Sequence, residues 1–240
     1  TIVEGYDAAA LLAGTASALP ITIQFKFKSN VTGVYGIAVA NSAVNRTYVG
    51  TITVADTAEH EYSVTLTMDT SGTWLYTNGA GLVLAMCLAS GTTYQTTAGS
   101  WQAGQFYTTS AQANFLSNTA NIAYLKRGQL IPGSVVQAYK PADIQKELAK
   151  CQRYWEDLSV GASTGWTGYL ATTAIARFHV PFIVTKRATP TVTGTAGNIN
   201  VNSLAGNNVG TSISGSAVTI NGSSVDLTVA GTPFTAGQGC

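Results

Sequence analysis

Charged residues are scarce in this chain. Only 10% of the 240 residues are Asp, Glu, Lys or Arg, against about 25% in an average soluble domain. The net charge is +1, and basic residues adjoin one another only at Lys126-Arg127 and Lys186-Arg187. Such a chain has no field that would attract a polyanion, so we expect no nucleic-acid partner. Its polarity comes instead from Thr, Ser, Asn, Gln and Gly, which predicts a neutral, hydrogen-bonding surface.

Cysteines and long apolar runs are also few. Cys87, Cys151 and Cys240 are odd in number, lie far apart and show no C-x-x-C spacing, so we expect no disulfide framework. The longest apolar run, Leu82 to Ala89, is eight residues, whereas a helix needs about 20 to cross a bilayer. No charged-then-apolar leader opens the chain. We therefore expect a soluble protein with no membrane insertion and no secretion signal.

Patterns that carry catalysis or metal binding are absent as well. His60 lies in a charged turn and His179 in an apolar run, and neither has a metal-ligand spacing. There is no nucleophile elbow and no phosphate-binding loop. Only one acid follows Asp157, so the last part of the chain cannot supply both carboxylates of a glycosidase. A pair such as Glu4 with Asp69 stays open in the first part, but turn acids are more often solvated. We expect a non-enzymatic protein with no metal and no cofactor.

The first part of the chain has the pattern of short strands. Apolar and polar residues alternate from Ile21 to Lys28, from Tyr35 to Val39 and from Tyr62 to Met68. The run Leu82 to Leu88 is apolar on both faces, which is typical of a central strand. A further strand is expected from Ile122 to Ile131, with Gly128 marking a bulge before the Pro132-Gly133 turn. Because no helical period intervenes, we expect residues 1–139 to form one antiparallel β-sandwich.

A helical period follows Pro141. Apolar residues recur at spacings of four and three, at Ile144, Leu148, Cys151, Trp155 and Leu158. Pro141 suits the first turn of a helix. We therefore predict one helix over residues 140–158, which links the sandwich to a second, smaller β-domain over residues 159–240.

The second domain is predicted from further β-patterns. Strands are expected over Ile175–Val184, Thr189–Thr193, Ser216–Ile220 and Val225–Val229. The last two form a hairpin, and a four-residue turn is favoured over a two-residue Asn-Gly turn because it sets Ile220 opposite Val225. The Gly- and Asn-rich stretch 194–216 could be a loop, brief strands or an element completed by a neighbouring subunit.

Aromatic residues in turn segments are the candidate ligand-binding residues. Sugar rings stack on exposed aromatic faces while Asn, Gln and Thr bond the hydroxyls, and this recognition needs little charge. The candidates are Trp74, Tyr76, Tyr94, Trp101 and Tyr107, and Trp166 and Tyr169 are comparable. The alternative is that these side chains cover the core of the sandwich or lie at a subunit contact.

Several motifs occur in a fixed order along the chain. They are Val3-Glu4-Gly5-Tyr6-Asp7, Gly72-Thr73-Trp74 with residues 77–82, Trp101-Gln102-Ala103-Gly104, residues 128–134, and the Glu-Leu-x-x-Cys-Gln-Arg-Tyr core at residues 147–154. After them, residues 186–193 read Lys-Arg-Ala-Thr-Pro-Thr-Val-Thr. In this order, the motifs resemble a family of bacteriophage and prophage tail proteins.

That resemblance implies a jelly-roll sandwich like a carbohydrate-binding module, a linking helix and a C-terminal β-domain, assembled as a homotrimer. It implies a virion tail fibre or tail-tip protein, made in the host cytoplasm, that contacts other tail proteins and attaches to a host surface glycan or receptor. Two departures stand out. Family members carry further strands before the Glu4-Gly5-Tyr6 motif, so we expect a sandwich lacking N-terminal strands. Ile131 replaces a usual Glu, which removes a carboxylate that could serve a structural ion.

Three functions follow from these patterns. The first is a tail fibre that mediates host attachment through a cell-surface glycan or protein. The second is a purely structural tail connector or decoration protein, in which the loop aromatics form an interface. The third is the glycan-binding module of a depolymerase.

Overall fold

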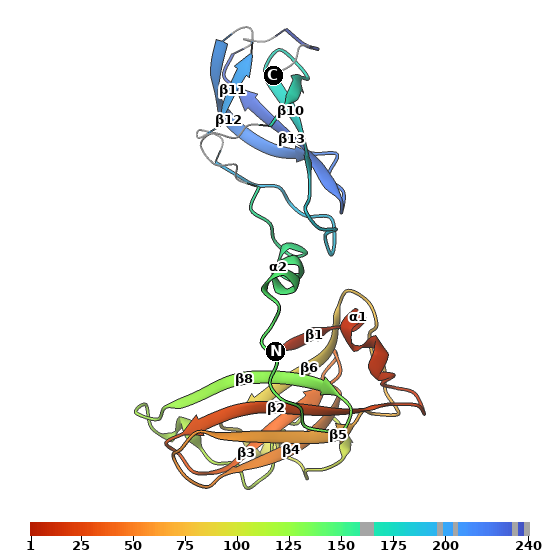
Figure 1. Cartoon of the computed structure of the whole chain (residues 1–240), viewed down its shortest axis with the longest axis vertical. Helices are drawn as coiled ribbons and strands as arrows, with labels where there is room; N and C mark the ends of the chain where they lie inside the picture. Colours follow the sequence, from red (N-terminus) through yellow and green to blue (C-terminus); the bar gives the residue numbers. More distant parts are fainter. Residues whose placement is uncertain (159–165, 196–198, 204–205, 232–234, 238–240) are drawn as a thin grey trace. The chain divides into compact units, whose positions relative to one another are not determined.

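The computed structural model describes residues 1–158, 166–195, 199–203, 206–231 and 235–237 (Figure 1). The chain forms two compact units, Thr1–Lys140 and Pro141–Cys240. Both units are built on antiparallel sheets, which confirms the predicted all-β class. Residue 159, where the second β-domain was predicted to begin, and Cys240 lie outside the described residues.

The first unit is a sandwich of two sheets. The larger sheet has the strand order β1-β6-β3-β4-β7, and the smaller sheet has the order β5-β2-β8. The strands are β1 (Ile2–Glu4), β2 (Pro20–Ser29), β3 (Gly33–Ala40), β4 (Arg46–Val54), β5 (His60–Thr67), β6 (Ala80–Cys87), β7 (Trp101–Ala103) and β8 (Ala123–Pro132). Short helices connect them: α1 (Gly5–Ala8), η1 (Ala9–Leu11), η2 (Thr92–Tyr94) and η3 (Phe115–Ser117).

One apolar core lies between these two sheets. The apolar side predicted for β2 is confirmed, because Ile21, Ile23, Phe25 and Phe27 are each at most 8% exposed. The polar side is exposed only in part, since Thr22 and Gln24 are buried as well. The four apolar side chains pack with residues of the opposite sheet such as Tyr35, which is fully buried. Phe27 and Tyr35 meet edge to face, with ring centroids 5.3 Å apart. A residue of this size stabilises the fold by about 1.5–3 kcal/mol through burial alone.

The bulge predicted in β8 is also confirmed. Gln24 pairs with Gln129 and Lys26 with Lys126, so Phe25 of β2 faces two residues, Arg127 and Gly128. Arg127 takes the left-handed backbone conformation, with φ of 52°. A bulge of this kind twists an edge strand and limits its pairing with other chains.

Strand β4 was not predicted, and Gly50 explains why. The buried residues of β4 are Thr47, Val49, Gly50, Ile52 and Val54. They are odd-numbered before Gly50 and even-numbered from it on, so no single alternation runs through the whole strand. A Cβ on Gly50 would lie 2.5 Å from Cγ1 of Val64 in the opposite sheet. The two sheets approach so closely here that position 50 requires glycine. This glycine interrupts the apolar–polar alternation by which β4 could have been recognised in the sequence.

The second unit has one five-stranded sheet. Its order is β11-β12-β13-β10-β9, with β9 (Gly168–Leu170), β10 (Ile175–Pro181), β11 (Asn200–Ser203), β12 (Gly206–Ser216) and β13 (Gly222–Val229). One face packs on a small core formed by Leu170, Ala176, Phe178, Val201, Leu227 and Val229. The stretch 194–216 thus contributes strands, and β12 is the longest of them; the strand predicted over Thr189–Thr193 does not form.

The predicted final hairpin was wrong in both register and extent. Strand β12 ends at Ser216, and Gly215, not Ile220, lies opposite Val225. Ala217 has a positive φ of 49°, and the hydroxyl of Thr219 accepts from the backbone N–H of Asn221, which turns the chain out of the sheet. Ile220 is 40% exposed, and its carbonyl accepts from Lys186 N at 2.7 Å instead.

The helix is shorter than predicted. Helix α2 runs over Ile144–Gln152 and belongs to the second unit. The Asp143 carboxylate accepts from Gln145 N and caps the helix, so Pro141 precedes the helix and is not in its first turn. Trp155 N donates to Cys151 O at 3.0 Å, which closes the last turn. None of the nine helical residues is buried, and no helix among the described residues is long and apolar enough to cross a membrane.

Candidate functional site

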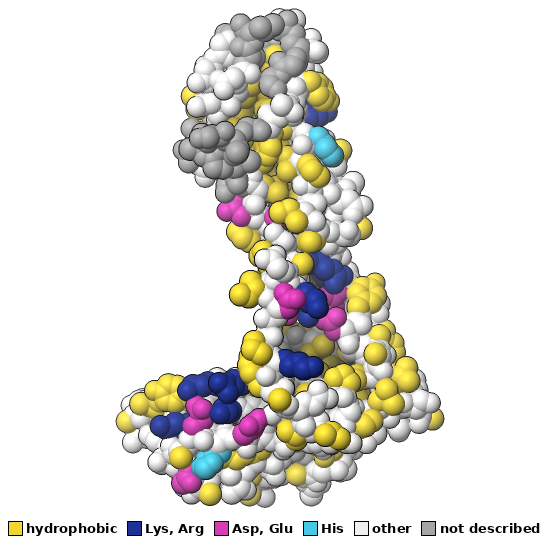
Figure 2. Space-filling view, viewed as in Figure 1, with side chains coloured by type: hydrophobic (Ala, Val, Ile, Leu, Met, Phe, Trp, Pro, Cys, Tyr) yellow, Lys and Arg dark blue, Asp and Glu magenta, His cyan; other side chains and the backbone are white. Residues whose placement is uncertain are grey.

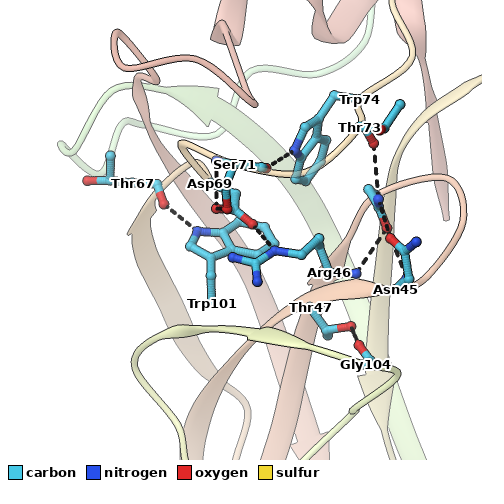
Figure 3. Close-up of polar contacts among 11 residues, drawn as sticks. Asn45, Arg46, Thr47, Thr67, Asp69, Ser71, Thr73, Trp74, Trp101 and Gly104 are labelled. Atoms are coloured by element: carbon cyan, nitrogen blue, oxygen red, sulfur yellow. Dashed lines mark hydrogen bonds and ion pairs between the residues drawn. The ribbon is translucent and has the colours of Figure 1, made fainter.

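Trp74 and Trp101 lie at the end of the sandwich and contact each other (Figure 3). Their rings are perpendicular, with centroids 5.4 Å apart. The indole N–H of Trp74 donates to Ser71 O at 3.0 Å, and that of Trp101 donates to Thr67 O at 2.8 Å. Trp74 is only 8% exposed, so its ring offers no free face to a sugar. The geometry makes Trp74 a core residue and places Trp101, partly buried, against the same core.

A buried ion pair holds the loop that carries Trp74 (Figure 3). The Asp69 carboxylate, 3% exposed, accepts from Nε of Arg46 at 2.5 Å and from the backbone N–H and hydroxyl of Ser71 at 3.0 Å each. Burial by itself would raise the pKa of Asp69, but the hydrogen bonds from Arg46 and Ser71 outweigh it and lower the pKa below its ordinary value. Asp69 is therefore ionised and engaged in holding the loop.

Tyr76 stands apart from the two tryptophans. Its hydroxyl donates to the carbonyl of Ala13, and burial raises the pKa of that hydroxyl. The side chain is 36% exposed. Tyr76 therefore ties the loop after Trp74 to the segment after η1, with part of its ring open to solvent.

Tyr94 and Tyr107 form a pair of partly open rings on two adjoining loops. Their ring centroids are 5.9 Å apart and their planes are inclined by 49°. Tyr107 N donates to Tyr94 O at 2.9 Å, and Thr96 N donates to Thr108 O at 2.9 Å, so the backbone fixes the spacing of the rings. Tyr94 is 43% exposed and Tyr107 is half-buried. Of the five candidates in the first unit, Tyr94 is the most exposed.

A depression begins one turn before Tyr94. Its volume is about 380 Å³, and its lining residues are Ala89, Ser90, Gly91, Gln112 and Asn114. Tyr94 N donates to Gly91 O at 3.1 Å, and the Gln95 amide donates to Ser90 O at 3.1 Å, which ties the turn of the tyrosine to the lining of the depression. This volume lies at the small end of the range for small-molecule sites, about 300–1,000 Å³.

Gln112 makes the floor of the depression rigid. Its amide oxygen accepts from Gly36 N at 2.9 Å and from the Thr108 hydroxyl, and its amide nitrogen donates to Cys87 O and Ala113 O at 3.1 and 2.9 Å. An amide can make about four hydrogen bonds, so Gln112 is saturated. The exposed Asn114 amide makes no hydrogen bond within the described residues and is available to a ligand.

The surroundings of Tyr94 and Tyr107 carry no charge of their own. Residues 70–125, which supply both loops and the whole lining of the depression, include no Asp, Glu, Lys or Arg. Figure 2 shows charged side chains of the first unit gathered mainly toward one end. The ion pairs of this unit include those of Glu59, which lies 2.7 Å from Lys126 and 4.0 Å from Lys26, all outside residues 70–125 or at most next to them in the chain. A ligand at the tyrosine pair thus meets hydroxyls, amides and rings.

The structure divides the predicted site residues into three groups: Trp74 with Trp101, Tyr76, and Tyr94 with Tyr107. Sequence reasoning missed the lining residues Ser90, Gln112 and Asn114. They are ordinary polar residues in loops that tertiary contacts bring together, such as the bridge between Gln95 and Thr108 and the hydrogen bond from the Gln112 amide to Cys87 O. No spacing in the sequence marks that contact.

Comparisons of the chain with family models, with curated proteins and with solved structures found no match. Among the described residues, no group of three or more His, Cys, Asp or Glu side chains is placed to hold a metal ion.

Proposed function

We propose that this chain is a non-enzymatic binding protein of a bacteriophage tail fibre or tail tip, and that its first unit attaches to a neutral glycan of the host surface. The observation that carries the proposal is the Tyr94–Tyr107 pair, with the Tyr94 ring exposed, beside an uncharged depression. Aromatic faces stack on the C–H faces of a sugar ring, and the free amide of Asn114 is suited to its hydroxyls.

The absence of charge favours neutral over acidic glycans. A carboxylate or phosphate bound at Tyr94 and Tyr107 would lose water without gaining a cation, because residues 70–125 hold none. A neutral hydroxyl needs only a hydrogen-bond partner of the kind these loops supply.

The tail assignment rests on the order of the motifs along the chain. Under this proposal the first unit is a jelly roll like a carbohydrate-binding module, the chain assembles as a homotrimer, and it resides in the virion beside other tail proteins. The β-sandwich supports this assignment at the level of fold class.

Replacing both Tyr94 and Tyr107 with alanine is expected to weaken attachment to bacterial cells about five- to thirtyfold, since the loss of two stacking rings costs about 1–2 kcal/mol. The measurement is the binding of fluorescently labelled chain to a panel of bacterial strains. Tyr124→Ala is the matched control, because Tyr124 is an exposed tyrosine as well, at 51%, but lies on strand β8 and not in either loop of the proposed site. Equal binding by both variants, or no binding of the native chain to any strain, would contradict the proposal.

A structural connector is the second candidate function, and helix α2 favours it. Ile144 is 79% exposed, Leu148 48% and Trp155, just after the helix, 73%. These apolar side chains are the kind that an interface covers. The aromatics expected at such an interface, Trp74 and Trp101, lie against the core instead, so their replacement by alanine would destabilise the first unit directly.

A further inference from the structure

The sheet of the second unit has one face that no core residue covers within the part of the chain that the structure describes. Its apolar side chains, such as Phe178 and Leu227, point to the core, so the alternate residues of each strand form the opposite face. In the register of the strands, Arg177 lies opposite Tyr169 of β9 and opposite Asp226 of β13. Asp226 in turn lies opposite Ser214 of β12. A row of these four side chains therefore crosses β9, β10, β13 and β12.

Arg177 is fixed at the centre of this row. Its Nε lies 2.6 Å from Oδ1 of Asp226 and its Nη2 lies 2.7 Å from Oδ2. Such a two-pronged pair holds the planar guanidinium in one orientation. Nη1 has only the Tyr169 hydroxyl near it within the described part of the chain, at 3.5 Å. An edge of the guanidinium therefore remains able to donate hydrogen bonds.

The charges of the row cancel. Asp226 is 9% exposed, and the hydrogen bond from Arg177 lowers its pKa, so the carboxylate is ionised beside the guanidinium. Arg177 and Asp226 are the only Asp, Glu, Lys or Arg residues in the five strands of this sheet as described. The face has a strong local dipole but no net charge.

Hydroxyl groups and one aromatic ring surround the pair. Tyr169 is 47% exposed. The neighbouring rows of the same face carry Ser224 with Ser216 and Thr228 with Ser212, from strand pairs β12 and β13. A cross-strand ion pair that served stability alone would need neither the exposed ring beside it nor a free guanidinium edge.

We infer that this open face is a second saccharide-binding site, separate from Tyr94 and Tyr107, and that it takes a neutral pyranose. The ring of Tyr169 stacks on the sugar, Nη1 of Arg177 donates to sugar hydroxyl oxygens, and the serine and threonine hydroxyls flank it. Because Asp226 offsets the charge of Arg177, a phosphate or carboxylate gains no advantage here.

Saturation-transfer NMR on the full chain tests the inference. The probes are the methyl glycosides of glucose, galactose and N-acetylglucosamine, with glucose 1-phosphate as the anionic probe. The background is the Y94A/Y107A variant, which removes the first site. We expect transfer to a neutral glycoside in that background and its reduction at least threefold on adding Tyr169→Ala. Arg177→Lys, which keeps the charge and loses the two-pronged geometry, should reduce transfer as well.

The outcomes separate the two sites. Transfer unaffected by Tyr169→Ala, no transfer from any glycoside, or stronger transfer from glucose 1-phosphate would each overturn the second site. Transfer that disappears already in Y94A/Y107A would also overturn it while supporting the first site. Tyr169 is exposed on an edge strand, so an unchanged melting temperature of Tyr169→Ala shows that a lost signal reflects binding and not unfolding.

Discussion

Replacing Lys186 with methionine is expected to lower the free energy of unfolding of the second unit by about 3–5 kcal/mol, the usual cost of breaking a buried ion pair. The side chains of Lys186 and Glu156 are 4% and 5% exposed. Nζ of Lys186 pairs with the Glu156 carboxylate, donates to Gln152 O at 2.5 Å and lies 4.8 Å from the centre of the Phe182 ring. Without Lys186, a buried carboxylate loses its cation.

The same contacts hold the end of helix α2. Gln152 is its last residue, and Arg187 N donates to Arg153 O at 3.0 Å just beyond it. Because no helical residue is buried, these bonds are the main attachment of α2 to the segment 182–187. We therefore expect Lys186→Met to release the helix as well as to destabilise the sheet.

Urea unfolding of the full chain, followed by circular dichroism and tryptophan fluorescence, measures the effect of Lys186→Met. The matched control is Lys146→Met, whose side chain is 80% exposed and pairs with Asp143 at 3.9 Å; its loss should cost at most about 0.5 kcal/mol. The double variant K186M/E156L should recover much of the stability, since no charge then remains buried. Equal destabilisation by Lys186→Met and Lys146→Met would refute the account of this pair.

Asp69→Asn is expected to destabilise the first unit by about 2–4 kcal/mol, because it removes the charge that Arg46 and Ser71 bind while leaving the site buried. The pKa of Asp69 is lowered in the folded chain. Its stabilisation is therefore complete above the unfolded pKa of about 3.9 and is lost as pH falls through the lower folded value.

Urea midpoints of the first unit between about pH 2 and pH 6 test the role of Asp69. The native chain should lose stability below about pH 4, and Asp69→Asn should show a shallower decline over that range. Asp56→Asn is the control: hydrogen bonds from Ala58 and His60 lower the pKa of this carboxyl too, but it lies in an exposed turn. If Asp69→Asn and Asp56→Asn gave the same curve, the buried pair would not be the source of acid sensitivity.

Strands whose apolar side chains recur every two residues could be predicted from the sequence, even where, as in β2 and β3, both faces are largely buried. This pattern located β2, β3 and β5 to within a few residues. It failed for β4, where Gly50 fits against Val64, and for the final hairpin, where a turn residue with positive φ ends the strand before Ile220. Both failures depend on contacts that periodicity does not encode.

The helix shows a different limit of sequence reasoning. The apolar spacing from Ile144 onward identified a helix, but its ends depend on hydrogen bonds to Asp143 and Cys151. Such an apolar side is usually buried, whereas Ile144 and Leu148 are exposed within this chain.

The candidate site could be predicted only in part. Turn composition identified Tyr94 and Tyr107, which lie together, but also Trp74, which is buried. Exposure of an aromatic ring depends on which loops fold over it, and composition does not report that. The lining residues Gln112 and Asn114 were missed because the two loops meet through a tertiary contact between Gln95 and Thr108.

The central claim is that this chain binds neutral glycans at uncharged loops of a β-sandwich. A glycan array that displays neutral glycans beside their sulfated, phosphorylated or sialylated counterparts tests it most directly, with the native chain and Y94A/Y107A as probes. We expect signal on neutral glycans, reduced about five- to thirtyfold by the double substitution. Signal confined to acidic glycans, or equal signal from both proteins, would contradict the claim.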